Sequence, residues 1–251
     1  MKGILRGAGY FILYLAITVI TQIAISLIAG QINNNLLGMT IISGVITGIV
    51  LYLVFKLRKK NVKQEWSMNR FAFTDLVKAC LLAFSFSSAF SILTSDMDIE
   101  NSKLMAASAQ YYSSLIPGLG MVLMILNLLI IAPAVEEIAL RGIVYTRIAK
   151  TAKPVVALIV SAVLFGLMHF MAGGIVLVIG ATITGLILGF LMYRYKSLWI
   201  CIIAHSCANI PNFIEFGKLI TSTGMRASIV IAFGVVFAVV LIRILKLKKS
   251  R

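Results

Sequence analysis

Charged residues are scarce in this sequence. Asp, Glu, Lys and Arg make up 12% of the 251 residues, whereas hydrophobic residues make up 61% and the mean hydropathy is +1.04. A soluble domain usually carries roughly a quarter charged residues. The chain therefore has too little polar material to cover a surface that faces water, which argues against an ordinary soluble domain.

The sequence also lacks short alternating strands and any pairing pattern of cysteines. Its apolar runs are continuous, and several reach the ~20 residues that cross a bilayer as a helix. The three cysteines, Cys80, Cys201 and Cys207, lie in apolar segments, where small packing residues are expected rather than disulfides or ligands. The predicted fold class is all-α, a polytopic integral membrane helix bundle of about eight transmembrane helices. The expected spans are 9–30, 36–55, 75–93, 118–140, 155–172, 175–193, 198–214 and 227–243.

Acidic residues are few, and the net charge of +15 raises the question of a nucleic-acid partner. The positions of the basic residues argue against one. If the N-terminus is cytoplasmic, twenty of the 23 Lys and Arg fall in cytoplasmic segments, which is the positive-inside pattern. The charge therefore predicts topology and an attraction to membrane lipid, with no nucleic-acid partner. We expect both termini and the loop 56–78 to be cytoplasmic, the loop 96–112 to be outside, and the membrane to be a bacterial plasma membrane.

Ionisable side chains within apolar spans are costly, and they mark a candidate site. Glu136 and Glu137 follow Pro133 at the end of a long apolar run. Pro133 cannot donate a backbone hydrogen bond, so the helix should kink just before the two carboxylates. Glu137 and Arg141 are four residues apart and can pair on one helix face. Taken alone, this pattern is equally compatible with an interfacial ion pair that has no chemical role.

The chain has only two histidines, and both lie in apolar spans. Phe165 precedes His169 by four residues, and His205 precedes Asn209 by four, so each pair shares a helix face. A single membrane histidine is more often a hydrogen-bonding partner than a catalyst. Two of them, with a carboxylate pair and an amide on three neighbouring spans, favour one shared site.

These residue types suit peptide hydrolysis by an activated water molecule. A carboxylate near an imidazole can accept the proton of a water, and a second imidazole and an amide can donate to an oxyanion. The zinc-protease motif HExxH and the serine and aspartyl motifs of other intramembrane proteases are absent from the sequence. Ser206 adjoins His205, but neighbouring residues on a helix diverge, so a Ser–His dyad is not expected.

Three segments resemble the motifs of the CPBP family, the CAAX proteases and bacteriocin-processing enzymes also called the Abi family. They are 132–142 (APAVEEIALRG), 165–169 (FGLMH) and 205–209 (HSCAN). The similarity covers roughly residues 130–210. It implies one integrated membrane domain, with N-terminal transmembrane helices and loops over 1–115 and a peptidase core with a C-terminal helix over 116–251. Leu140 replaces the aromatic residue that the family often has before the motif arginine. This difference could alter packing or substrate preference, but it removes no catalytic group.

The resemblance also implies roles for individual residues. Glu136 and His169 would activate the water, and His205 and Asn209 would form the oxyanion hole. Glu137 and Arg141 would be supporting residues that orient Glu136 and hold the fourth span. The supporting set predicted for the site is Glu137, Arg141 and Phe165.

Metal dependence is left open by the residue types. His169, His205 and Glu136 form a possible donor set for a divalent metal such as zinc. Because Asn209 would be a poor zinc ligand, the prediction is that no cofactor is required.

Two other functional classes compete with the peptidase. A non-catalytic membrane adaptor of the same fold should have lost a motif residue, and none is lost here. A transporter should have matching broken helices in two inverted halves, whereas the polar residues here gather in the second half. The expected substrate is a membrane-associated or prenylated protein or peptide, with bacteriocin or pheromone processing or immunity as its bacterial context. The sequence does not predict the oligomeric state.

Overall fold

The computed structural model describes residues 2–28, 40–95, 110, 118, 120–214, 216–220 and 222–246. Over these residues the chain is helical, and the one β contact is a single antiparallel bridge between Met68 and Ser197. The prediction of an all-α fold is confirmed. Most of the predicted external loop 96–112 and the C-terminal residues 247–251 lie outside the described part of the chain.

Long helices account for most of the described chain. They are α1 (Lys2–Ile28), α2 (Thr40–Leu57), α4 (Phe73–Thr94), a continuous stretch from α6 to α8, α9 (Pro154–Met168), α10 (Phe170–Tyr195), α11 (Leu198–Asn209) and α13 (Thr223–Lys246). The continuous stretch consists of α6 (Gly120–Leu126), the π-helical η1 (Asn127–Ile131), α7 (Ala132–Glu137), the π-helical η2 (Ile138–Tyr145) and α8 (Thr146–Ala149). The short elements are α3 (Val62–Glu65), the 3-10 helix η3 (Ile210–Phe213) and α12 (Phe216–Leu219).

Five helical stretches in the described chain are long and apolar enough to cross a membrane. They are Gly3–Ile25, Phe73–Thr94, Gly120–Ala149, Gly174–Tyr195 and Thr223–Lys246. Three further apolar helices, Ile42–Leu57, Pro154–Met168 and Leu198–Phe213, are shorter. The chain is thus a polytopic membrane protein, and each predicted span matches a helix or helical stretch, although only five reach full spanning length.

Two predicted span boundaries differ from the ends of the helices. The sequence placed the break between the fifth and sixth spans at residues 173–174, but the chain turns at His169, and α10 begins at Phe170. The fourth span was expected to end at residue 140, but its helix continues to Ala149. Apolar side chains on both sides of His169 hide the one-residue turn. Hydropathy also does not register that a helix continues beyond its apolar run, as the fourth one does past Arg141 and Arg147.

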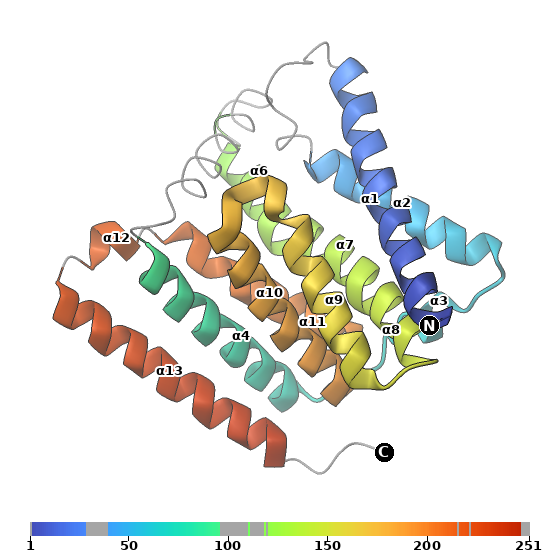
Figure 1. The fold of residues 1–251 in the computed structure, drawn as a ribbon. Coiled ribbons are helices and arrows are strands. Elements are labelled where there is room, and N and C mark those ends of the chain that lie inside the picture. Colours follow the sequence, from blue (N-terminus) through green and yellow to red (C-terminus); the bar gives the residue numbers. More distant parts are fainter. Residues whose placement is uncertain are drawn as a thin grey trace.

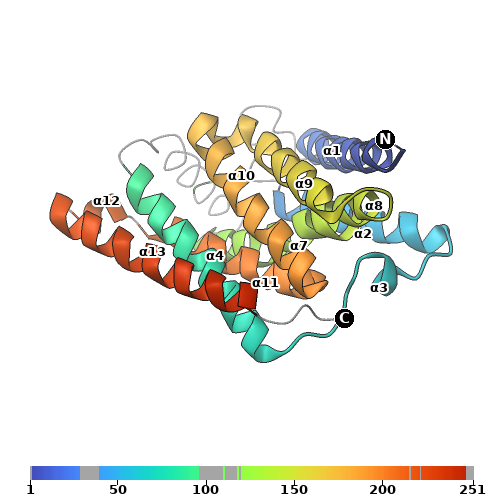
Figure 2. The same ribbon diagram turned by 60° about the horizontal axis from the view of Figure 1, so that its bottom comes forward.

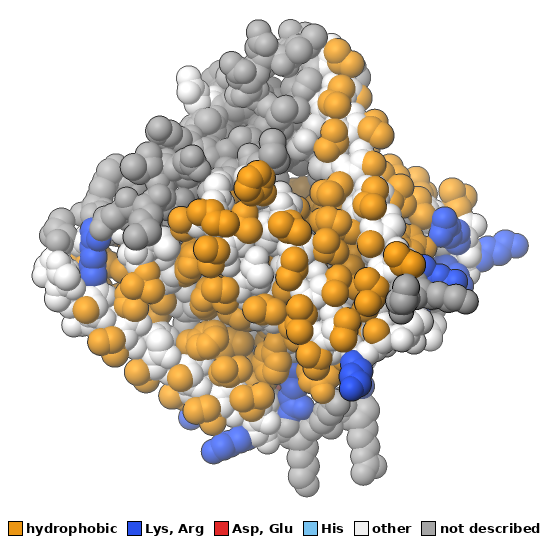
Figure 3. Space-filling view, viewed as in Figure 1, with side chains coloured by type: hydrophobic (Ala, Val, Ile, Leu, Met, Phe, Trp, Pro, Cys, Tyr) orange, Lys and Arg blue, Asp and Glu red, His pale blue; other side chains and the backbone are white. Residues whose placement is uncertain are grey.

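The helices form a bundle in which α4 lies between α13 and α11, while α9 and α10 make a closely packed hairpin (Figures 1 and 2). On the other side, α1 packs along α2, η2 and α8. The start of α1 and the end of α13 lie toward the same side of the molecule (Figure 1). Figure 3 shows a broad apolar face, with Lys and Arg mainly at its lower and right margins. This arrangement has the form expected of a helix bundle surrounded by lipid.

Glycines allow α9 and α10 to approach closely. A Cβ atom added at Gly185 would lie 2.9 Å from the Cα of Ala162, and one at Gly189 would lie 3.0 Å from the Leu158 Cγ. The small residues of α10 therefore face α9. Such contacts are a main source of helix association in lipid, where the hydrophobic effect does not drive one helix against another.

We expect Gly185→Val to destabilise the protein, because the added side chain meets the backbone of α9 rather than a flexible side chain. Overpacking of this kind typically costs about 1–3 kcal/mol. The measurement is the midpoint of thermal unfolding in detergent. The matched control is Gly234→Val on α13, where an added Cβ meets nothing within 4 Å. Equal midpoints for the two variants would contradict the packing argument.

Candidate active site

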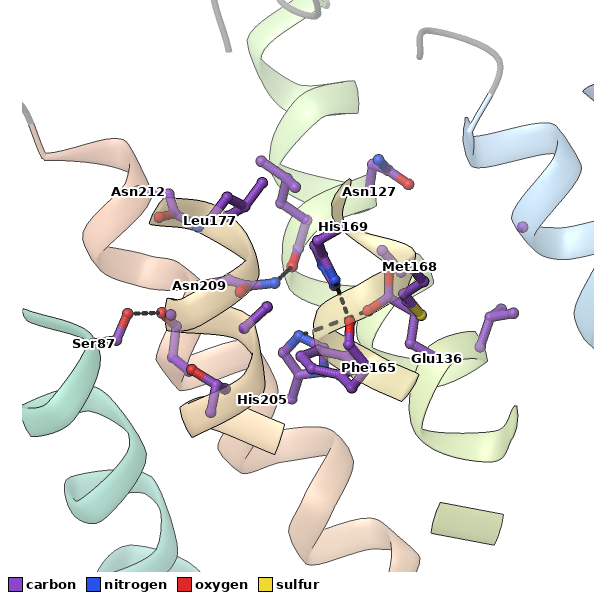
Figure 4. A pocket seen from close by; sticks show the side chains of 18 of the residues that line it. Ser87, Asn127, Glu136, Phe165, Met168, His169, Leu177, His205, Asn209 and Asn212 are labelled. Carbon is purple, nitrogen blue, oxygen red and sulfur yellow. Dashed lines mark hydrogen bonds and ion pairs between the residues drawn. The ribbon is translucent and has the colours of Figure 1, made fainter. Parts of the chain in front are cut away.

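A cavity of about 390 Å³ lies within the bundle. Glu136 of α7, His205 and Asn209 of α11, and His169 in the turn after α9 all line it, together with Phe165 (Figure 4). The structure thus brings the four predicted catalytic side chains, which come from three separate sequence segments, to one cavity. The cavity is a suitable size for part of a peptide chain.

The helix that carries Glu136 is irregular where Pro133 interrupts its hydrogen bonds. The Ala132 N–H bonds to the carbonyl of Asn127, five residues back, and Pro133 has no N–H to donate. The carbonyls of Leu128 and Leu129 consequently need other donors. π-Helical segments are rare and frequently occur at functional sites.

Side chains of α11 supply those donors. The Asn209 Nδ2 donates to the Leu128 carbonyl at 2.9 Å, and the Ser206 hydroxyl donates to the Leu129 carbonyl at 2.6 Å. The hydroxyl of Ser206 is also 3.0 Å from the carbonyl of Ile202. Ser206 therefore bonds to backbone, as expected for a residue that forms no dyad with His205. Asn209 is held to the kinked helix through one N–H and keeps its second N–H.

His169 is fixed by the residue that precedes it by one helical turn. Its Nδ1 lies 2.7 Å from the backbone carbonyl of Phe165. Because a carbonyl only accepts, Nδ1 carries the proton in this contact, and the neutral ring keeps a lone pair on Nε2. The ring centroids of Phe165 and His169 are 4.8 Å apart. The predicted sharing of one face by Phe165 and His169 is thus observed.

His205 lies between the two adjacent carboxylates. Its Nδ1 is 3.1 Å from the Glu137 Oε1, and its Nε2 is 4.0 Å from the Glu136 Oε2. The edge of its ring meets Phe165, with centroids 5.3 Å apart. The sequence did not predict the contact with Glu137, because the two residues are 68 positions apart. Glu137 fixes the ring of His205, whereas orientation of Glu136 by Glu137 and Arg141 remains a prediction.

Arg141 and Glu137 form an ion pair that is fully buried. The Arg141 NH1 donates to the Glu137 Oε1 at 2.7 Å, and both side chains are 0% exposed. The second terminal nitrogen donates to the carbonyl of Gly185 at 2.8 Å. The guanidinium also lies over the ring of Phe165, 4.9 Å from its centroid. The predicted pairing is confirmed, and it links the fourth span to α9, α10 and α11.

The first half of the chain contributes a wall of the cavity that was not predicted from the sequence. The cavity is also lined by Tyr14, Thr18 and Gln22 of α1, and by Ser87 and Ser91 of α4. In each helix these polar residues recur every four positions within an apolar span, and this spacing could have identified them. The apolar part of the wall includes Phe86, Phe90, Leu177, Gly180 and Ala181.

The residues do not form an evident metal site. Within the described part of the chain, no three His, Cys, Asp or Glu side chains form a group that could hold one metal ion.

We expect Arg141→Ala to reduce stability sharply. It would leave the carboxylate of Glu137 buried without its cation, and breaking a buried pair in this way costs about 3–5 kcal/mol. Yield and the thermal unfolding midpoint in detergent would both fall. Arg243→Ala, which removes an exposed arginine from α13, is the matched control. An Arg141→Ala protein as stable as wild type but inactive would instead indicate a direct role in catalysis.

Comparison with known families agrees with the geometry. The family model described as "Type II CAAX prenyl endopeptidase Rce1-like" matches residues 118–211, a stretch that contains every predicted site residue. No curated protein and no solved structure matches the chain. The match confirms the resemblance to the CAAX protease family and supports, at the level of that family, a multi-pass membrane peptidase of the CAAX type.

Proposed function

We propose that the chain is an intramembrane endopeptidase that hydrolyses a peptide bond of a membrane-associated or prenylated protein or peptide. The observation that carries the proposal is the convergence of Glu136, His169, His205 and Asn209 on one cavity within an apolar bundle. Ionisable side chains within apolar membrane spans are energetically costly, and they usually mark a functional site. Their chemistry is that of acid–base catalysis with oxyanion stabilisation.

Glu136 and His169 are the groups that activate water in this proposal. The carboxylate of Glu136 lines the cavity with a side-chain exposure of 18%, and the Nε2 of His169 keeps a lone pair because Nδ1 donates to Phe165. A water between them gives its proton to one of these bases while its oxygen bonds to the scissile carbonyl carbon. The carbonyl oxygen becomes an oxyanion. Collapse then breaks the C–N bond, and the same proton passes to the leaving amine.

Asn209 and His205 stabilise that oxyanion. Asn209 uses one N–H on the Leu128 carbonyl and has a second N–H to donate. His205 can donate from Nε2 only when both of its ring nitrogens are protonated, because Nδ1–H faces Glu137. The imidazolium would then lie between two carboxylates, which can balance its charge. Glu137 acts on the reaction through His205 and not on the substrate.

The cellular setting is part of the proposal. The distribution of basic residues supports a multi-pass protein of a bacterial plasma membrane with both termini cytoplasmic. The substrate would then be a CAAX-type protein, a bacteriocin or a peptide pheromone, in processing or in immunity.

We expect Glu136→Gln to lower the cleavage rate by about 10²- to 10⁴-fold, the usual effect of losing a general base. The substitution preserves size, so helix packing should be kept. His169→Ala should cause a comparable loss. The measurement is cleavage of a farnesylated CAAX peptide or a bacteriocin precursor by purified protein, or rescue of a deletion phenotype.

Asp75→Asn is the matched carboxylate-to-amide control, because Asp75 pairs with Lys78 at the start of α4 and does not line the cavity. The Asp75→Asn variant should cleave the substrate at the wild-type rate. If Glu136→Gln and His169→Ala are produced at normal levels and both retain full function, the protein acts as a membrane adaptor and the peptidase proposal fails.

We also expect activity to survive exhaustive chelation. The described donors do not form a three-ligand group, and Asn209 takes the place that a zinc site would give to a stronger ligand. The cleavage rate is measured before and after dialysis against a chelator. Loss of activity with recovery on addition of zinc alone would favour a metal site at His169, His205 and Glu136.

A further inference from the structure

A second hollow, separate from the catalytic cavity, lies near the start of α1. It has a volume of about 470 Å³ and is lined by Arg6, Gly9, Tyr10, Leu13, Arg58 and Arg147. No lining residue is shared with the catalytic cavity. Three of its six residues are arginines and none is acidic. We call it the arginine groove.

Two of the three arginines contact one aromatic ring. The guanidinium of Arg58 lies 6.0 Å from the centroid of Tyr10, and that of Arg147 lies 5.7 Å from it. The NH1 of Arg58 also donates to the Tyr10 hydroxyl at 2.8 Å. Arg147 packs in addition on Phe55, 5.4 Å from its centroid. Contacts with the rings hold two like charges near each other, an arrangement that a bound anion would stabilise.

One carboxylate beside the groove forms ion pairs with two of the nearby cations. Glu65 pairs with Arg147 at 2.8 Å and with Lys150 at 2.9 Å. Burial raises the pKa of Glu65, but the hydrogen bond from Lys150 and the charge of Arg147 lower it by more, so the pKa lies below its usual value. Glu65 is therefore already ionised at neutral pH and already shared by two cations. Within the described chain, no carboxylate pairs with Arg6 or Arg58.

Close helix packing fixes the shape of the groove. A Cβ atom added at Gly7 would lie 2.7 Å from the Ile148 Cγ1, and one added at Gly3 would meet the side chain of Thr151. The start of α1 is thus held against α8 and the turn that follows it. This contact places Arg6 and Tyr10 on α1 beside Arg147 on α8.

The helices that carry the groove also expose apolar side chains. Leu5 and Ile12 on α1 are 67% and 65% exposed, and Leu57 at the end of α2 is 81% exposed. Only 11% of the spanning window of α1 is buried. A ligand with an anionic group and long hydrocarbon chains can therefore contact both the arginines and the exposed apolar side chains. A free anion can contact only the arginines.

We propose that the arginine groove binds the phosphate group of an anionic membrane phospholipid, whose acyl chains lie along α1. A guanidinium group can donate two parallel hydrogen bonds to the oxygens of one phosphate. Basic pockets between membrane helices are known to bind lipid headgroups. The groove lies at the basic end of α1, the end that the predicted topology places at the cytoplasmic leaflet, where anionic lipid is found. The proposal does not depend on peptidase activity.

The test uses the full-length protein in a neutral detergent. Phosphatidylglycerol, phosphatidylcholine and inorganic phosphate are added separately, and bound lipid is counted by native mass spectrometry alongside the thermal unfolding midpoint. We expect phosphatidylglycerol alone to bind tightly and to raise the midpoint. Arg6→Gln and Arg58→Gln should each weaken its binding about five-fold, the usual effect of one basic residue at a membrane surface. Arg243→Gln with Lys246→Gln, at the end of α13, is the matched control and should bind as wild type.

Each other outcome overturns the proposal. Equal binding of phosphatidylcholine would show that the groove does not select charge, and an equal midpoint shift with inorganic phosphate would make a free anion the ligand. An equal loss in the α13 control would show that charge acts without a specific groove. Arg58→Gln could disturb the fold, because Arg58 donates a hydrogen bond to Tyr10. Arg6→Gln guards against this, since Arg6 is exposed and its loss should leave the fold intact.

Discussion

The fully buried ion pair of Glu137 and Arg141 connects the parts of the molecule that the site requires. Its two charges lie within one helix, but their remaining contacts reach three others: the carbonyl of Gly185, the ring of Phe165 and the imidazole of His205. A buried charge is tolerated only when it is paired and hydrogen-bonded, so these neighbours are constrained to their positions. The same contacts orient the ring of His205 in the cavity. Stability and site geometry therefore depend on one interaction.

A second constraint comes from Pro133. Pro133 has no N–H for the carbonyl of Leu129, and the Ala132 N–H bonds to Asn127 instead of Leu128. Ser206 and Asn209 donate to these two carbonyls instead. The two hydrogen bonds join α11 to η1, the segment just before the proline. Asn209 is consequently held beside the cavity, where its free N–H is available. A defect in one helix thus positions a polar group on another.

Much of this site could be predicted from the sequence, because the informative features are local. A spacing of four residues predicts the pairing of Glu137 with Arg141, and apolar spans make two histidines conspicuous. The contact of His205 with Glu137 could not be predicted, since it depends on how two distant helices pack. The turn at His169 was also missed, because apolar side chains on both sides mask a break in a helix. The polar wall of α1 and α4 was overlooked since weakly polar Thr, Ser and Tyr hardly change the hydropathy of a span.

The central claim is that Glu137 and Arg141 act as a coupled unit. A double-mutant cycle tests it most directly, using the unfolding free energies in detergent of Glu137→Met, Arg141→Met and the variant that carries both. The account predicts a coupling energy of about 2–3 kcal/mol, with the double variant more stable than the sum of the single losses implies. Single losses that add to within about 0.5 kcal/mol would contradict it.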